Sequence, residues 1–95
     1  MAITLDTTLS RNGDILYSPV NTEEAVMLNV PLGRYFALNA VAVRIWELLE
    51  QPMTVAQVCA RICEEFEVDK QTCESAVLKF ADEFLDNGIV QASAA

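Results

Sequence analysis

Hydrophobic and polar positions over residues 15–38 follow a period of about two, which is the period of a β-strand. Two β-rich segments, ILYSPV at 15–20 and EAVMLNV at 24–30, are separated by only three residues, a spacing that favours antiparallel pairing. VPLG at 30–33 predicts a second turn before RYFAL at 34–38, because Gly33 can take a positive φ. We therefore predict a three-stranded meander.

After Asn39, a helix-capping residue, the hydrophobic period changes to about 3.6 residues. This change predicts a helix that ends before Pro52. Its apolar face comprises Leu38, Val41, Ala42, Ile45, Leu48 and Leu49.

Two further helices are predicted by their ends. Thr54 and Gln57 fit a capping box at the start of a helix that ends near Val68. Asp69 can cap the next helix, which Asn87-Gly88 terminates before a short apolar tail, IVQ.

The expected fold class is α+β, with a three-stranded antiparallel sheet followed by three helices, like a winged helix-turn-helix. We expect one domain over residues 14–91, preceded by an irregular segment at 1–13 and followed by a disordered tail at 92–95.

The charge balance excludes several partners. Six basic residues face 14 acidic ones, giving a net charge of −8, whereas nucleic acids and anionic membranes bind Lys and Arg. No apolar run approaches the roughly 18 to 20 residues of a membrane span. The N-terminal segment lacks the basic and apolar regions of a signal peptide, so we expect a cytoplasmic protein.

The chain also lacks residues and motifs on which catalysis commonly depends. It has no histidine and no glycine-rich phosphate loop, so we expect no enzyme activity and no cofactor. Cys59 and Cys63 share a spacing with metal-binding motifs, but they fall on the apolar stripe of the second helix. We predict that these thiols and Cys73 are reduced core residues that hold no metal. The expected function is therefore binding.

Two features indicate where a partner binds. The segment 34–38 is the last strand of the meander, so one of its edges is expected to be free. The apolar arc of the third helix is wider than a core contact requires, and the surplus side chains are ordinary overhang, a dimer contact or one wall of a groove. These side chains are Leu78, Ala81 and Leu85. A free edge beside an apolar helix can accept a peptide as an added strand.

Residues 33–90 resemble the PqqD-like proteins, which recognise the precursors of ribosomally made, modified peptides. The matching motifs are G-R-Y-F-x-L-N at 33–39, I-W-E-L-L at 45–49, P-x-T-V at 52–55, F-x-V-D at 66–69 and F-x-x-x-L-x-x-x-G-I-V ending at 90. Phe84 departs from this pattern, since it stands where the family has an aliphatic residue.

The resemblance implies a non-catalytic protein that binds a precursor's leader peptide between the third strand and the third helix. The segment GRYFALN is most similar to the corresponding segment in the recognition proteins of lasso-peptide clusters, whose usual partner is a transglutaminase-like cysteine protease. A pyrroloquinoline-quinone chaperone with a radical-SAM partner is an alternative, as is a winged-helix adaptor or dimerisation module.

The implied site has a strand side and a helix side. Arg34, Tyr35, Phe36, Ala37 and Leu38 would supply the receiving edge, and about half of them would face the core. The opposite wall would comprise Val77, Leu78, Ala81 and Leu85. Glu74 and Asp82 would lie near its margin and favour leaders that carry Lys or Arg.

Overall fold

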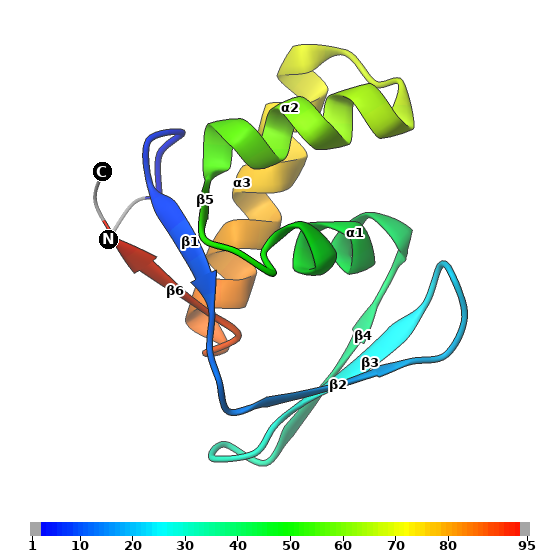
Figure 1. Cartoon of the computed structure of the whole chain (residues 1–95), viewed down its shortest axis with the longest axis vertical. Helices are drawn as coiled ribbons and strands as arrows, with labels where there is room; N and C mark the ends of the chain where they lie inside the picture. Colours follow the sequence, from blue (N-terminus) through cyan, green and yellow to red (C-terminus); the bar gives the residue numbers. More distant parts are fainter. Residues whose placement is uncertain (1–2, 94–95) are drawn as a thin grey trace.

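The computed structural model describes residues 3–93 as two three-stranded antiparallel sheets and three helices (Figure 1). One sheet contains β2 (Ile15–Pro19), β3 (Ala25–Asn29) and β4 (Arg34–Leu38) in the order β2-β3-β4. Its register aligns Met27 with Tyr17 on one side and with Phe36 on the other. The predicted meander and the α+β fold class are confirmed.

The second sheet was not predicted. It contains β1 (Thr8–Arg11), the two-residue β5 (Met53–Thr54) and β6 (Val90–Ser93) in the order β5-β1-β6. Figure 1 shows β1 and β6 side by side, although they lie at opposite ends of the chain. Pairing with this distant strand orders residues 8–11, which corrects the prediction that 1–13 are irregular. The predicted tail at 92–95 begins inside β6, and residues 1–2 and 94–95 lie outside the described residues.

The helices are α1 (Ala40–Leu48), α2 (Val55–Phe66) and α3 (Lys70–Asp86). Each begins at the predicted cap: Asn39 accepts a hydrogen bond from the Ala42 N–H, Thr54 forms the capping box with Gln57, and Asp69 accepts from the Thr72 N–H. In the part of the chain that the structure describes, no helix is long and apolar enough to cross a membrane.

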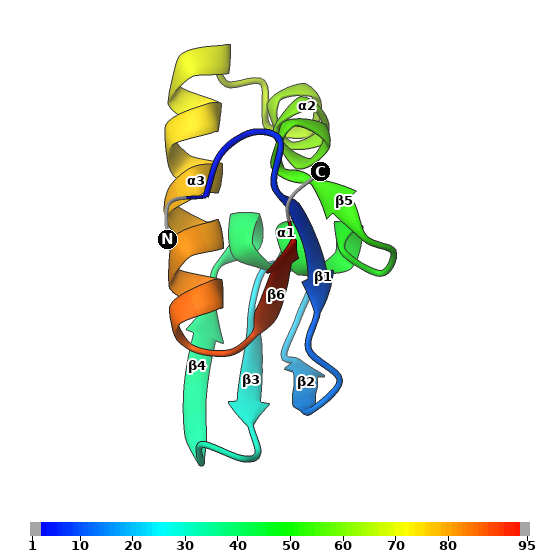
Figure 2. The same cartoon turned by 90° about the vertical axis from the view of Figure 1, so that its left-hand side faces the viewer.

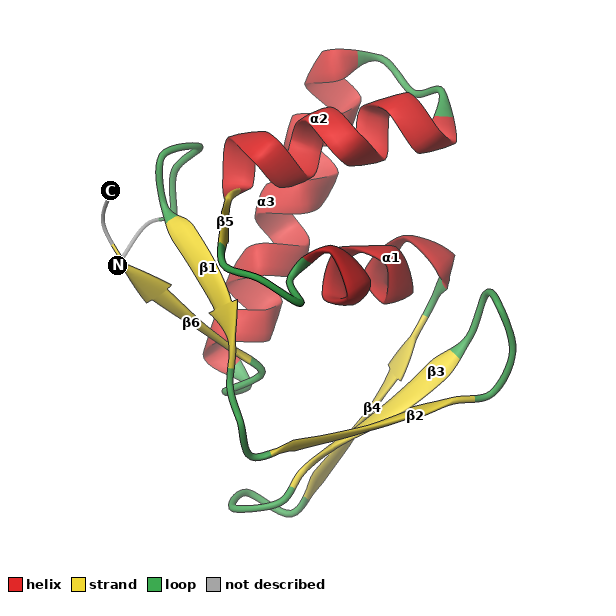
Figure 3. Ribbon diagram, viewed as in Figure 1, coloured by secondary structure: helices red, strands yellow, loops and turns green. Residues whose placement is uncertain are grey.

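The core lies between the helices and the two sheets (Figure 2). Residues from every layer are almost completely buried, including Leu9 of β1, Met27 of β3, Ile45 of α1, Val58 of α2 and Val77 of α3. The sheet β2-β3-β4 contributes only one face to this core, because burial alternates along β3, and the helices lie on one side of this sheet (Figure 3).

Candidate functional site

The strand β4 lies at an edge of its sheet and pairs along its whole length with β3, from Asn29 opposite Arg34 to Ala25 opposite Leu38. Among the described residues no strand pairs with its other side, so its outward N–H and C=O groups are available. The opposite edge strand, β2, ends in Pro19, which has no N–H to donate. Of the two edges, β4 is therefore the one without proline.

A cavity of about 110 Å³ lies between β4 and α3. Figure 2 shows the C-terminal end of α3 above β4. Most of the residues that line this cavity are apolar, and Glu83 is the charged residue among them. The lining residues are Phe36, Ala37, Leu38, Asn39, Ala42, Phe80, Glu83, Phe84, Asn87 and Ile89. The rings of Phe80 and Phe84 are tilted by 56° with their centroids 6.2 Å apart, so two aromatic side chains form much of the α3 side.

The C-terminal end of α3 is tied to the sheet by Asn29, the one buried polar side chain among residues 3–93. Asn29 Nδ2 donates to the Asn87 carbonyl oxygen at 2.8 Å, and its Oδ1 accepts from the Leu32 N–H at 3.3 Å. Arg34 Nη1 of β4 also donates to Asn87 Oδ1, at 3.4 Å. These contacts fix the spacing between the two walls of the cavity at this end.

The backbone after α3 follows a Schellman motif, in which the Gly88 N–H donates to the Leu85 carbonyl at 3.1 Å and the Ile89 N–H donates to the Phe84 carbonyl at 2.8 Å. Gly88 has a φ of +71°, as the predicted left-handed terminator requires. This turn directs the chain from α3 into β6 and holds Asn87 over Asn29.

The structure brings only part of the predicted site together. Phe36, Ala37 and Leu38 line the cavity, while Arg34 and Tyr35 are exposed on the same strand. On α3, Val77 and Ala81 are each 1% exposed and belong to the core.

The remaining predicted residues of α3 lie elsewhere. Leu78 and Leu85 are half-buried against the core and do not line the cavity. Glu74 lines a different cavity, and Asp82 is exposed. A peptide-binding role for these residues remains a prediction that the geometry of the cavity does not favour.

The predicted and the observed α3 walls of the site differ in which flank of α3 faces β4. At about 100° per residue, Leu78 and Leu85 lie about 140 to 160° around the helix from Phe80. The wall toward β4 consists instead of Phe80, Glu83, Phe84 and Asn87. A helical wheel gives the width of the apolar arc but not which end of it faces the free strand. The spaced motif F-x-x-x-L-x-x-x-G contained the missing signal, since its first two positions are Phe80 and Phe84.

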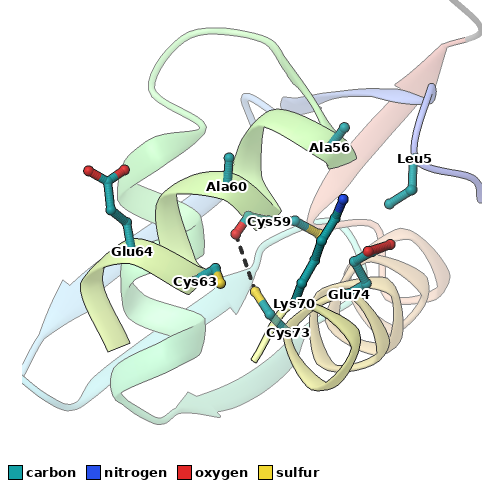
Figure 4. A pocket seen from close by; sticks show the side chains of 9 residues that line it. All are labelled: Leu5, Ala56, Cys59, Ala60, Cys63, Glu64, Lys70, Cys73 and Glu74. Carbon is teal, nitrogen blue, oxygen red and sulfur yellow. Dashed lines mark hydrogen bonds between the residues drawn. The ribbon is translucent and has the colours of Figure 1, made fainter. Parts of the chain in front are cut away.

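A larger cavity of about 490 Å³ lies between α2 and α3 (Figure 4). It is lined by Leu5, Ala56, Cys59, Ala60, Cys63, Glu64, Lys70, Cys73 and Glu74. Cys73 Sγ donates to the Cys59 carbonyl at 3.2 Å, and Cys63 Sγ donates to the Val68 carbonyl at 2.9 Å. The predicted core position is confirmed for Cys59 and Cys73, whereas Cys63 is half-buried.

The buried thiols of Cys59 and Cys73 are poorly suited to nucleophilic or metal-binding chemistry. Burial raises the pKa of Cys59 from 9.0 to about 11, helped by the neighbouring Cys73, and burial also raises the pKa of Cys73. A protonated thiol is a weak nucleophile and a weak metal ligand. Within residues 3–93 no three His, Cys, Asp or Glu side chains are placed to hold a metal ion.

Comparison with known proteins places this architecture. The chain matches the family described as coenzyme PQQ synthesis protein D (PqqD) over residues 24–90, which is more than half of its length. The chain belongs to the PqqD family. The predicted resemblance is thereby confirmed, and no curated protein matches the chain.

Two solved structures share the PqqD-family fold. One is TbiB1 in complex with the TbiA(beta) leader peptide, at 28% identity and a TM-score of 0.80, covering 90% of this chain and 99% of TbiB1. The other is the PqqD truncation of Methylobacterium extorquens PqqCD, a stand-alone RiPP recognition element. It has 16% identity and a TM-score of 0.78, and the match covers 95% of each chain. The present chain therefore has the fold of a RiPP recognition element.

Proposed function

We propose that this PqqD-family chain is a non-catalytic recognition protein that binds the leader of a ribosomally made precursor peptide as an added strand on β4. The observation that carries the proposal is the unpaired edge of β4 beside an apolar cavity. Similarity to TbiB1, whose structure holds a leader peptide, supports it.

The proposed contacts divide into backbone and side-chain groups. The N–H and C=O groups of 34–38 hydrogen-bond the leader backbone, and alternate leader side chains enter the cavity against Phe36, Phe80 and Phe84. Several hydrogen bonds worth about 0.5 to 1.5 kcal/mol each, with two or three buried side chains worth about 1.5 to 3 kcal/mol each, offset the cost of association. We expect a Kd of about 1 µM or tighter.

The bound leader is then delivered to a processing enzyme. The segment GRYFALN is similar to the corresponding segment of lasso-peptide recognition proteins, and this similarity favours a transglutaminase-like leader protease in the cytoplasm as that enzyme. An enzyme of the radical-SAM class is the alternative partner.

A scan of the leader backbone tests strand addition without disturbing the protein. Labelled synthetic leader peptides, each with one N-methylated residue, are titrated by fluorescence anisotropy. Since only every second N–H of a strand faces a given neighbour, we expect affinity to be lost with a period of two along the bound segment. Equal affinity for every methylated peptide would refute the proposed β-strand addition.

Substitutions in the protein provide the reciprocal test. Proline at an outward-facing N–H of β4 is expected to abolish binding while the helical circular dichroism is retained. Binding that survives proline at each of the positions 34–37 would exclude β4 as the receiving edge.

A further inference from the structure

The sheet β2-β3-β4 has a second face, turned away from the helices, that is also apolar. The register places Leu16, Leu28 and Tyr35 in one row across it and Ser18, Val26 and Ala37 in the next. Leu16 is 60% exposed and Tyr35 is 73% exposed. An antiparallel sheet with one solvated face normally carries polar residues there, so this outer face has the composition of a contact surface.

Both ends of the outer face carry a carboxylate. Alternation along the strands places Asp14 before Leu16 and Glu24 before Val26 on this face, about 20 Å apart at about 3.3 Å per residue. Backbone bonds continue the sheet at these ends, from the Val30 N–H to the Asp14 carbonyl and from the Val20 N–H to the Glu24 carbonyl. The one basic residue of the three strands, Arg34, alternates onto the inner side, where it contacts Asn87.

A second copy of the chain is a poor occupant of this face. Two copies would bring together faces that are acidic at both ends, each on a chain with a net charge of −8. Charge is the property that argues against a second copy. Area does not separate the occupants, because three strands of five residues cover only about 250 Å² in projection and a specific interface buries about 800 Å² per partner, so any occupant must also contact surface beside the sheet. The charges therefore favour a different molecule, one that is basic where this face is acidic.

The outer face is continuous with the leader site. Tyr35 and Ala37 lie on β4, the strand whose free edge accepts the leader under the proposed function, and Ala37 also borders the cavity between β4 and α3. A leader added to β4 becomes a fourth strand, and every second one of its side chains faces outward beside Tyr35 and Ala37. Binding of the leader thus enlarges the outer face on the side where it is open.

We propose that the outer face and the outward side chains of the bound leader together form the docking surface for the processing enzyme. The enzyme's matching surface has an apolar centre with Lys or Arg toward both ends, opposite Asp14 and Glu24. This inference rests on the proposed function. Because the leader supplies part of the surface, leader and enzyme bind with positive coupling, and each raises the affinity of the other by the same factor.

The test uses Leu16→Lys, which adds a charge on β2, the strand farthest from the leader edge, together with Thr22→Lys as a control. Thr22 is exposed in the turn between β2 and β3, so its substitution makes the same change in net charge outside the outer face. Leader affinity is measured by anisotropy, and affinity for the purified processing enzyme of this precursor is measured by biolayer interferometry with and without leader.

We expect Leu16→Lys to bind the leader within about twofold of wild type and to lose about tenfold or more in enzyme affinity, because the lysine would be buried unpaired beside basic residues. Thr22→Lys should change neither. Equal enzyme affinity for the two variants would overturn the docking surface, as would a matching loss of leader affinity in Leu16→Lys.

Two further outcomes separate the occupants. If wild type binds no leader, the proposed function fails. The enzyme affinity of the unloaded protein, compared between wild type and Leu16→Lys, then still tests the outer face by itself. Sedimentation velocity of the chain alone, in which we expect a monomer, addresses self-association. A dimer that Leu16→Lys dissociates would overturn the assignment to an enzyme.

Discussion

Replacing Gly88 by alanine should perturb the joint between α3 and the sheet more than the backbone conformation alone predicts. Gly88 has a φ of +71°, and a Cβ built there would lie 2.8 Å from Asn29 Nδ2. Gly33 has a similar φ of +63°, but nothing lies within 4 Å of its Cβ position. A Cβ at Gly88 would also lie 3.8 Å from Leu32 Cδ1, which is an ordinary van der Waals contact, so the two glycines form a matched pair that differs in one close contact.

The magnitude follows from the contacts of Asn29. A left-handed backbone costs an L-residue about 1 to 2 kcal/mol, and the reduced freedom of the unfolded chain returns about 0.4 to 1 kcal/mol, at both sites. At Gly88 the new Cβ must also displace the buried Asn29 side chain, which breaks its 2.8 Å hydrogen bond to the Asn87 carbonyl oxygen. A buried polar group without its partner costs about 1 to 3 kcal/mol, so Gly88→Ala should be less stable than Gly33→Ala by that amount.

Thermal unfolding followed by circular dichroism measures this difference. For a domain of this size, about 1 to 3 kcal/mol corresponds to a Tm about 5 to 20 °C lower for Gly88→Ala than for Gly33→Ala. In an Asn29→Ala background the two substitutions should cost the same within about 0.5 kcal/mol, because the contact is gone. Equal Tm values in the wild-type background would refute the role of Asn29.

Three other perturbations have defined outcomes. Arg11 donates to the Trp46 carbonyl through Nε at 3.1 Å and Nη2 at 2.7 Å, and its guanidinium lies 4.4 Å from the Trp46 ring centroid. Lysine cannot reproduce this fork, so Arg11→Lys should lose about 1 to 2 kcal/mol in urea unfolding, and an unchanged midpoint would contradict this. Burial raises the pKa of Cys59 from 9.0 to about 11, so the folded state keeps the thiol proton up to a higher pH than the unfolded state does. The free energy of unfolding should therefore be constant below about pH 9 and fall between about pH 9 and 11. Cys59→Ala should flatten that fall in urea titrations, and an equally steep fall would assign it to other groups. Glu83→Gln should slow association of a Lys-containing leader in stopped flow, as salt does for wild type, and leave dissociation nearly unchanged. A strong rise of the dissociation rate would instead indicate a complex held by ion pairs.

The parts of the fold that could be predicted are those fixed by neighbouring residues. Asn39, Thr54 and Asp69 cap their helices through side chains three residues from the N–H groups they satisfy, so the sequence alone identifies them. The strand β1 is different, because TLSR has no clear alternation and is ordered by β6, near the other end of the chain. Asn12 extends this pairing by donating to the Gly88 carbonyl, 76 positions away. No local pattern encodes such a contact.

The same division applies to the candidate site. The edge position of β4 could be predicted, because it is the last strand of a meander and each of its turns is local. The flank of α3 that faces β4 could not, since it depends on the tie between Asn29 and Asn87. With this hydrogen bond in place, Phe80 and Glu83 line the cavity beside β4, whereas Leu78 packs against the core.

The geometry of β4 explains how so short a strand can serve several purposes. Its inner side chains, such as Leu38 at 6% exposure, contribute to the core, so their loss should reduce stability first. Its backbone edge is proposed to carry the leader, so N-methylation of the leader or proline in the strand should reduce binding while the core remains packed. Its outer side chains, such as Tyr35, contact neither the core nor the cavity between β4 and α3. A strand has two faces and one free edge at right angles to them, so substitutions in β4 should alter stability, the proposed leader binding and the proposed enzyme docking separately.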